Sequence, residues 1–373
     1  MRISIIAGIS RIFSYTYLKK IQAVLLLLVF SFHIIGTFPI ANATIGVIGT
    51  IVTPDSPGVS WPDMFTLVGT KLYVNSYAGG FQVIDTTTNR TISNTLNAGG
   101  SRFADAPVPA LVGTKLYITN QTQSRVDVVD TTTDTLLPSI PLSGEPNGCI
   151  ASGNKLYVFG NLGWVVIIDT TTDTPLAPIT SFGPYSYKVA SFGTNIYVAD
   201  ISWLSVIDTT TDTVSQINSY NYAFASFRLA WSKLYITNWY ANNVTVIDTL
   251  TNTELTTVPT GSHPIKTSLV GTKLYVNQTD SIGIIDTTTD TVIGSISAIG
   301  YNSGLESIVV GTKLYFDTNV TPTSTASSTF SVVDTTTDTI IWTIPLWGFT
   351  SQHLDAKLIG SNIYVGNQIG RAS

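Results

Sequence analysis

The sequence has few of the residues from which catalytic and metal sites are usually built. Of its 373 residues, one is cysteine and three are histidine, and only 11% are charged. The single cysteine, Cys149, excludes an intramolecular disulfide framework and any zinc site built on Cys-x-x-Cys pairs. Three histidines leave little material for a histidine-based metal or catalytic site. The 18 basic residues are outnumbered by 23 acidic ones, which argues against a nucleic-acid-binding surface.

The first 43 residues differ in composition from the rest of the chain. Four basic residues come first, an apolar stretch follows over residues 21–35, and a small-x-small pattern ends at Ala43. This order predicts a secretory signal peptide over residues 1–43 that is cleaved after Ala43. The alternative is an uncleaved membrane anchor, because residues 21–40 are just long enough to span a bilayer. In either case we expect residues 44–373 to be secreted or held at the cell surface. No membrane span is expected in this part of the chain.

Two sequence blocks recur along residues 44–373 with a spacing of about 40 residues. The first resembles Gly-Thr-Lys-Leu-Tyr and occurs eight times, and the second resembles Val-Ile-Asp-Thr-Thr-Thr-Asp-Thr and follows it in seven units. The tyrosines of the first block are Tyr73, Tyr117, Tyr157, Tyr197, Tyr235, Tyr275, Tyr315 and Tyr364. The first aspartates of the second block are Asp85, Asp130, Asp169, Asp208, Asp248, Asp286 and Asp334. Two independent blocks that keep their register identify a tandem repeat.

Each repeat unit divides into four short apolar runs bounded by turn residues, which predicts four strands. In the unit around Tyr275 the runs cover residues 267–270, 273–277, 282–285 and 291–296. β-Branched and aromatic residues dominate them, and no helical apolar periodicity occurs after residue 44. Four strands in each of many consecutive repeats are typical of an all-β fold, a β-propeller of four-stranded antiparallel blades.

The two ends of the repeat region predict how the ring closes. Residues 44–51 resemble the fourth strand of a unit, and residues 354–367 supply a further first and second strand. We therefore expect residues 44–373 to form a single propeller domain of eight blades. The eighth blade would be split between the two termini and would have no recognisable third strand. The alternatives are seven blades with overhanging strands and a chain that stops inside its last blade.

The repeat blocks resemble the YVTN-type β-propeller repeats of surface-layer and secreted proteins. The matching segments are residues 117–120 and 235–238, both Tyr-Ile-Thr-Asn, together with residues 73–75 and the Val-Ile-Asp-Thr-Thr-Thr segments. The resemblance covers nearly all of residues 44–373. It implies a propeller that is secreted or at the cell surface. It implies no particular chemistry, because function resides in sites added to such a fold.

The repeated Asp-Thr-Thr-Thr-Asp segment has two interpretations. Alternating oxygen ligands suit a calcium loop, but the segment has no glycine and no downstream bidentate glutamate. We favour a turn between the third and fourth strands, in which the first aspartate accepts backbone N–H bonds. The lysines of the first block are expected on the same face of the propeller as these aspartates. Together they are interpreted as surface ion pairs, each contributing about 0–1 kcal/mol.

Function is expected where the repeats differ from one another. The connections from second to third strands, and from each fourth strand to the next unit, share the face opposite the Asp-Thr turns and vary in content. The aromatic residues expected between second and third strands are Trp164, Trp203, Trp239 and Tyr240. Aromatic side chains exposed on one rim suit sugar stacking or a protein partner. The alternative is that they fill gaps between blades.

Charged residues also occur at a pseudo-symmetric position at the start of the first strands, beside the predicted central channel. We hypothesise that they form a polar ligand-binding patch at the channel mouth; they are Lys188, Arg228, Lys266, Glu306 and Asp355. The alternative is that they neutralise one another in a water-filled channel.

Two functions compete on this evidence. The first is a non-enzymatic binding or structural module at the cell surface, with a protein or a glycan as its partner and no cofactor, metal or nucleic acid. The second is a propeller enzyme of lactonase-like or quinone- or haem-dependent type, with its chemistry at the channel. A haem would need an axial histidine, and only His263 and His353 follow residue 43. No Gly-x-Ser-x-Gly segment supports a hydrolase triad. We therefore expect the protein not to be an enzyme.

Overall fold

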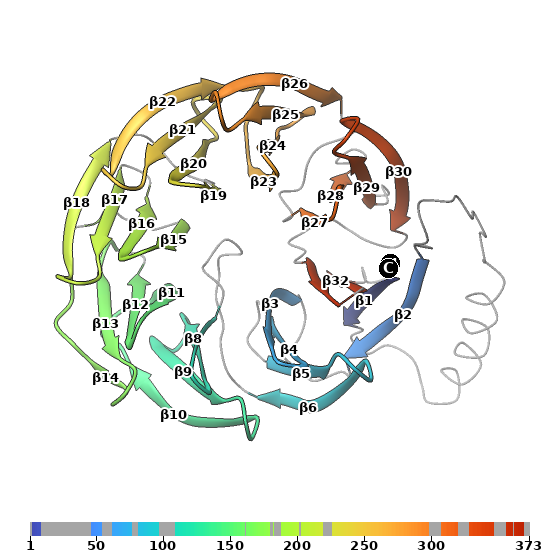
Figure 1. The fold of residues 1–373 in the computed structure, drawn as a ribbon. Helices are drawn as coiled ribbons and strands as arrows, with labels where there is room; N and C mark the ends of the chain where they lie inside the picture. Colours follow the sequence, from blue (N-terminus) through green and yellow to red (C-terminus); the bar gives the residue numbers. More distant parts are fainter. Residues whose placement is uncertain are drawn as a thin grey trace, which may run out of the picture.

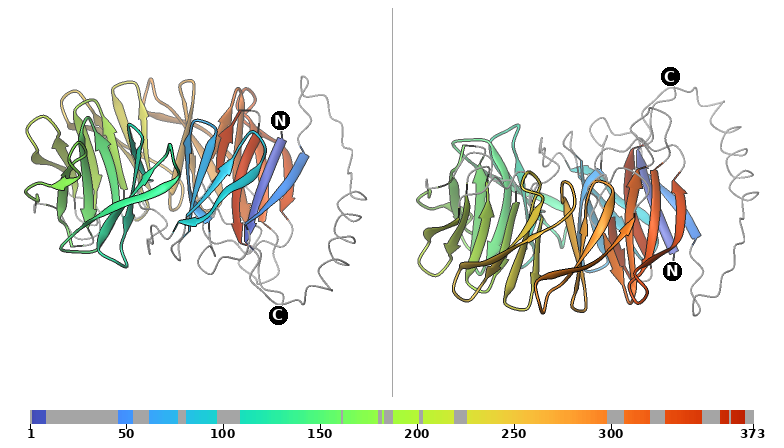
Figure 2. Two further views of the ribbon diagram at one scale, coloured as in Figure 1. Left: turned by 90° about the horizontal axis from the view of Figure 1, so that it is seen from below. Right: turned by 90° about the horizontal axis from the view of Figure 1, so that it is seen from above.

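A computed structural model shows eight four-stranded sheets arranged in a ring around a central axis (Figure 1). Seen edge-on, the ring is a disc whose strands run across its thickness (Figure 2). The structure describes residues 2–8, 46–53, 62–76, 81–96, 109–160, 162–179, 182, 188–200, 203–218, 226–297, 307–319, 328–346, 356–360 and 362–368. These residues form strands and turns, and none of them belongs to a helix that could cross a membrane. The predicted all-β propeller is confirmed, with eight blades.

Seven blades follow one another along the chain, and in each the first strand is innermost. The first four are β3 (Pro62–Val68), β4 (Lys71–Ser76), β5 (Phe81–Asp85) and β6 (Arg90–Leu96); β7 (Ala110–Val112), β8 (Lys115–Asn120), β9 (Arg125–Asp130) and β10 (Thr135–Pro141); β11 (Pro146–Ser152), β12 (Lys155–Gly160), β13 (Val165–Asp169) and β14 (Thr174–Pro175); β15 (Lys188–Phe192), β16 (Asn195–Ala199), β17 (Leu204–Asp208) and β18 (Thr213–Asn218).

The next three blades have the same antiparallel order. They are β19 (Phe227–Ala230), β20 (Lys233–Asn238), β21 (Asn243–Asp248) and β22 (Thr253–Pro259); β23 (Lys266–Val270), β24 (Lys273–Asn277), β25 (Ser281–Asp286) and β26 (Thr291–Ser297); β27 (Ile308–Val310), β28 (Lys313–Asn319), β29 (Ser328–Asp334) and β30 (Thr339–Leu346). The turns from first to second and from third to fourth strands lie on one face of the disc, here called the turn face. The remaining connections lie on the opposite face, the loop face.

The eighth blade joins the two ends of the chain. Its strands, from the axis outward, are β31 (Ala356–Ile359), β32 (Asn362–Gln368), β1 (Arg2–Gly8) and β2 (Gly46–Thr53). The outermost strand β2 is the predicted N-terminal contribution, so the ring closes through both termini. The expectation that this blade lacks a third strand is corrected: β1 occupies that place and pairs in parallel with both neighbours. Cleavage after Ala43 would remove β1 and leave the three strands that the sequence predicted.

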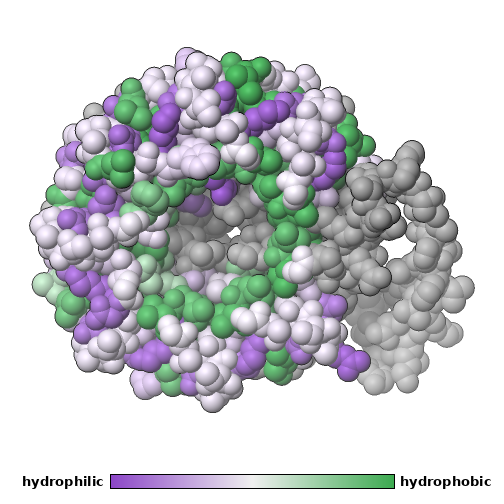
Figure 3. Space-filling model, viewed as in Figure 1, coloured by the Kyte–Doolittle hydropathy of each residue, from purple (hydrophilic) through white to green (hydrophobic). Residues whose placement is uncertain are grey.

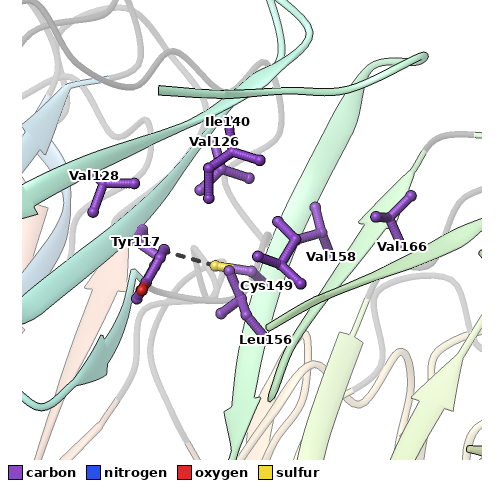
Figure 4. Packing of buried hydrophobic residues seen from close by; sticks show 9 residues of the cluster. Tyr117, Val126, Val128, Ile140, Cys149, Leu156, Val158 and Val166 are labelled. Carbon is purple, nitrogen blue, oxygen red and sulfur yellow. Dashed lines mark hydrogen bonds between the residues drawn. The ribbon is translucent and has the colours of Figure 1, made fainter. Parts of the chain in front are cut away.

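The core lies between the blades, which explains why the middle strands are apolar on both sides. The second and third strands are almost continuously buried, whereas the fourth strands are mostly exposed to solvent. One cluster of buried side chains, for example, joins Val126 and Val128 of the second blade to Cys149, Leu156 and Val158 of the third (Figure 4). Burial raises the pKa of the Cys149 thiol to about 12, so this residue packs as a small apolar group.

The Asp-Thr segments form the predicted turns between third and fourth strands. In the second blade, Asp130 Oδ1 accepts hydrogen bonds from the backbone N–H and the hydroxyl of Thr132, at 2.8 and 2.6 Å. The last residue of each turn has a left-handed backbone, with φ of 56° at Asp134 for example. Aspartate and asparagine adopt this conformation more readily than other non-glycine residues. This requirement explains why the fifth position of the segment is always one of these two residues.

These turns also connect neighbouring blades, a role that the sequence interpretation as surface pairs missed. In the first blade, Tyr73 donates its hydroxyl to Asp134 Oδ1 at 2.6 Å, and Lys71 Nζ lies 2.7 Å from the other oxygen of that carboxylate. Asp134 belongs to the second blade. The same contact recurs for Lys115 and Tyr117 with Asp173, Lys155 and Tyr157 with Asp212, Lys233 and Tyr235 with Asp290, and Lys273 and Tyr275 with Asp338. The tyrosines are fully buried, so each carboxylate is held at a blade interface and not on an open surface.

Candidate functional site

The loop face over the fifth and sixth blades carries an aromatic cluster. Trp239 and Tyr240 lie in the turn between β20 and β21, and His263 lies in the connection from β22 to β23. The Trp239 ring centre is 4.7 Å from that of Tyr240 in an edge-to-face arrangement, and 4.2 Å from that of His263 in a tilted stack. Tyr240 is 56% exposed, while Trp239 and His263 are half-buried. The cluster therefore presents aromatic surface to solvent on a packed base.

Hydrogen bonds between the loops fix the position of His263. Asn242, in the turn after β20, accepts the backbone N–H of His263 through its side chain at 2.8 Å and that of Thr260 through its carbonyl at 2.9 Å. On the other side, the N–H of Thr279 donates to the carbonyl of Ser262 at 3.0 Å. The connection is thus bonded to loops of two blades, and His263 is held with a left-handed φ of 52°. The His263 part of the cluster is therefore held in place by its backbone.

The neighbouring Gln278 shows why this loop contains glycines. Its buried side chain fills the space that Gly261 and Gly283 leave open. A Cβ atom at Gly261 would lie 2.1 Å from Gln278 Oε1, and one at Gly283 would lie 2.3 Å from Nε2. Only glycine permits this approach, so the loop beneath His263 is closely packed.

Of the other predicted aromatic residues, one has a structural role and one is partly open to solvent. Trp164 packs into its own blade, because a Cβ at Gly160 would lie only 1.9 Å from its indole ring, and it contacts the cluster around Cys149. Trp164 therefore fills a gap, as the alternative interpretation held. Trp203 is 37% exposed, and its backbone N–H donates to the buried Asp200 at 2.7 Å. It lies one blade away from Trp239.

The charged residues predicted at the channel mouth do not occupy equivalent positions. Lys188 and Lys266 do begin β15 and β23, and their partners two residues after the repeat tyrosine are Ala199 and Asn277. Arg228 instead pairs directly with Tyr235, so it is two residues further along its strand. The residue nine positions before Tyr235, which is equivalent to Lys188 and Lys266, is Ser226.

Arg228 makes a contact between blades. Its Nε and Nη2 atoms donate to the backbone carbonyl of Thr267 on β23, at 3.1 and 2.7 Å. Arg228 therefore ties the fifth blade to the sixth, and its role in a ligand patch stays a prediction. Glu306 and Asp355 lie outside the described residues. Viewed along the axis, apolar residues gather around the central hollow, whereas the outer rim mixes polar and apolar residues (Figure 3).

The sequence interpretation missed three residues that stand out in the structure. His263 was considered only as a haem ligand, although it stacks on Trp239. Trp231 and Leu250 lie on the turn face, where only repeated structure was expected, and are 75% and 77% exposed. Their signal was present, because they replace the glycine of the first block and a threonine of the second. Among the described residues, no group of three or more histidine, cysteine, aspartate or glutamate side chains could hold a metal ion.

Comparison with known proteins supports the fold and does not assign a family. No protein-family model matches the chain, and no curated protein matches its sequence. BamB from Moraxella catarrhalis is similar in structure, with a TM-score of 0.63 and 11% identity over 83% of this chain and 95% of that chain. The computationally designed Ika8 protein has a TM-score of 0.65 and 10% identity over 82% and 93%.

A third similar structure is that of an enzyme. Dihydro-heme d1 dehydrogenase NirN, solved in complex with DHE, has a TM-score of 0.61 and 12% identity over 77% of this chain. The chain spans 66% of NirN, slightly less than two thirds of its length. At identities of 10–12% these likenesses establish the propeller architecture alone.

Proposed function

We propose that this protein is a non-enzymatic binding module of the YVTN propeller type, exported and held outside the cytoplasm. Its recognition surface is the loop face, with a cell-surface glycan as the partner that best suits it and a protein surface as the alternative. The observation that carries this proposal is the cluster of Trp239, Tyr240 and His263.

The chemistry of this cluster suits a sugar ring. Aromatic side chains combine an apolar ring with a polar edge, and they contribute most when their orientation is fixed before binding. Here the rings are supported by loop hydrogen bonds on both sides, and Tyr240 offers more than half of its surface. Lys266 begins β23 three residues after His263, so a cationic residue follows the cluster closely in the sequence. Trp203, in the corresponding turn of the adjacent blade, is a further partly exposed aromatic residue on this face.

The test is binding of the exported protein to a panel of cell-wall glycans. We expect Trp239→Ala and Tyr240→Ala each to weaken binding by about tenfold or more, the scale of a hot-spot aromatic. Trp231→Gly is the matched control, because it also removes an exposed aromatic ring but on the opposite face. If both loop-face variants bind every glycan as the unmodified protein does, the glycan proposal is wrong. Binding of a protein and of no glycan would support the alternative partner.

The non-enzymatic part of the proposal is tested separately. We expect the purified protein to have no visible absorbance band and no stoichiometric metal or organic cofactor by mass spectrometry and elemental analysis. A stoichiometric chromophore or metal would reverse the choice in favour of the propeller-enzyme alternative.

A further inference from the structure

The turn face of the fifth blade departs from the repeat at two adjoining turns. In seven blades the turn from first to second strand contains a glycine with φ between 58° and 60°. In the fifth blade this position is Trp231, with φ of 59°. A left-handed backbone is unfavourable for a bulky side chain. The indole is 75% exposed, so packing does not offset this strain.

The second departure is Leu250, in the neighbouring turn of the same blade. Six other blades have a threonine here whose hydroxyl donates to the first aspartate of the turn, as Thr288 does to Asp286 at 2.8 Å. Leu250 keeps only the backbone N–H bond to Asp248, and its side chain is 77% exposed. The two turns adjoin, because the N–H and hydroxyl of Thr249 both donate to the carbonyl of Ser232. Trp231 and Leu250 therefore lie exposed on adjoining turns, and together they are here called the blade-5 patch.

The surroundings of the blade-5 patch are acidic. The five lysines that face other blades are each paired with the last aspartate of a turn, and Lys313 is paired with Asp334. Among the described residues, this leaves six first aspartates of these turns without a salt bridge, namely Asp85, Asp130, Asp169, Asp208, Asp248 and Asp286. The exposed Arg90 of the first blade lies across the ring from the fifth. At the nearest interface, between the fourth and fifth blades, Asn195 and Asn252 replace the usual lysine and aspartate.

We propose that the blade-5 patch is a docking site for a protein segment that carries both basic and apolar side chains. Trp231 and Leu250 supply the apolar anchor, and Asp208, Asp248 and Asp286 on the turns around it favour a cationic partner. Aromatic anchors bordered by complementary charge are typical of energetically important interface positions. A site that keeps an unfavourable backbone conformation and gives up a turn hydrogen bond is one where function opposes stability. This surface is separate from the loop face, so the inference does not depend on the proposed glycan site.

The experiment uses three synthetic peptides of equal length. One alternates lysine with leucine, one alternates lysine with serine, and one alternates glutamate with leucine. Titration calorimetry with the exported protein should show the lysine–leucine peptide binding at least about tenfold more tightly than either of the others. The double variant Trp231→Gly/Leu250→Thr, which restores the repeat sequence in the fifth blade, should lose about tenfold or more of that affinity. Tyr240→Ala, on the opposite face, should bind all three peptides as the unmodified protein does.

The thermal stability of the double variant distinguishes a docking role of Trp231 and Leu250 from a structural role. Because Trp231→Gly relieves the backbone strain and Leu250→Thr restores a hydrogen bond, the double variant should unfold at the same temperature or higher. A lower unfolding temperature would show that the two residues hold the fold together and would overturn the proposal. Unchanged affinity for the lysine–leucine peptide in the double variant would overturn it as well. So would self-association of the unmodified protein in sedimentation that the double variant abolishes, since the occupant would then be a second copy of the chain.

Discussion

The repeat tyrosines have two roles, because the ring packs in the core and the hydroxyl makes a hydrogen bond. Each ring is buried between two blades, and in five interfaces the hydroxyl donates to an aspartate of the next blade at 2.5–2.7 Å. Burial, and then the hydrogen bond to the carboxylate, raise the pKa of these phenols well above the usual value near 10. The phenols are therefore neutral donors at any physiological pH.

The charge of the acceptor determines how much each of these hydrogen bonds contributes to the free energy of unfolding. Tyr235 donates to the carboxylate of Asp290, whereas Tyr197 donates to the amide oxygen of Asn252. A bond to a charged group contributes about 1.5–3 kcal/mol and a neutral one about 0.5–1.5 kcal/mol. We expect Tyr235→Phe to lower the free energy of unfolding by the larger amount and Tyr197→Phe by the smaller, measured by denaturant titration. Equal losses would show that the charge of the acceptor does not matter here.

At the scale of strands and turns, the blade interfaces show a matched substitution within one chain. Where the last residue of a turn is aspartate, the facing second strand of the preceding blade begins with lysine. At the interface between the fourth and fifth blades both positions are asparagine, and Asn195 Nδ2 donates to Asn252 Oδ1 at 3.3 Å. The eighth blade also begins its second strand with asparagine, Asn362, and the turn of the first blade ends in Asn89, which accepts the Tyr364 hydroxyl at 2.6 Å. The residue at the end of each turn therefore matches its partner on the preceding blade, and the conformation of the turn alone does not explain the choice between aspartate and asparagine.

This matching predicts a measurable coupling between Lys155 and Asp212, whose charged atoms are 2.6 Å apart. Lys155→Asn and Asp212→Asn should each lower the free energy of unfolding, because each leaves one partly buried charge without its partner. The double variant should lose less than the two single losses combined, by about 0.5–3 kcal/mol, since it reproduces the pair found at Asn195 and Asn252. Denaturant unfolding of all four proteins gives the coupling. Strict additivity would contradict the matched-pair explanation.

For the molecule as a whole, the buried tyrosines predict sensitivity to alkaline pH. Their pKa is higher in the folded chain than in the unfolded one, so the stabilisation is complete below pH of about 10 and declines as pH rises further. Each tyrosine makes the free energy of unfolding fall by up to about 1.4 kcal/mol per pH unit in that range. Tyr235→Phe should therefore show a shallower decline above pH of about 10 than the unmodified protein. Parallel declines in the two proteins would contradict a raised pKa for Tyr235.

The eighth blade makes stability depend on the N-terminus. In the full chain β1 pairs with β2 and β32, while the proposed cleavage after Ala43 removes it. We expect amide hydrogens of β2 and β32 to exchange more rapidly in a chain that begins at Thr44 than in the full chain. Exchange in β16 and β17, on the far side of the ring, should be the same in both and serves as the control. Equal exchange at β2 would show that β1 does not contribute to closure.

Within the candidate sites, the sequence predicted which connections carry aromatic residues better than how those residues are arranged. It placed Trp239, Tyr240 and Trp203 on one face correctly, because repeat spacing shows which segments connect strands. It could not separate Trp164, which packs on Gly160, from the exposed Tyr240, because burial in a connection depends on neighbouring loops. It misplaced Arg228, which pairs with its repeat tyrosine as Ala190 and Ser268 do, and not at the position of Lys188 and Lys266.

By itself the sequence determined four strands per repeat, because local apolar patterns and turn residues carry that information in every unit. It also predicted eight blades closed by both termini, with seven blades as the alternative. Only the tertiary structure decided which side chains meet, because contacts between blades join residues that are far apart in the sequence, by 55 positions for Tyr157 and Asp212. The ring places each turn against the preceding blade, and this arrangement converts repeated aspartates and lysines into interfacial ties. It also leaves the side chains of Trp231 and Leu250 exposed, so two residues that depart from the repeat lie on the surface.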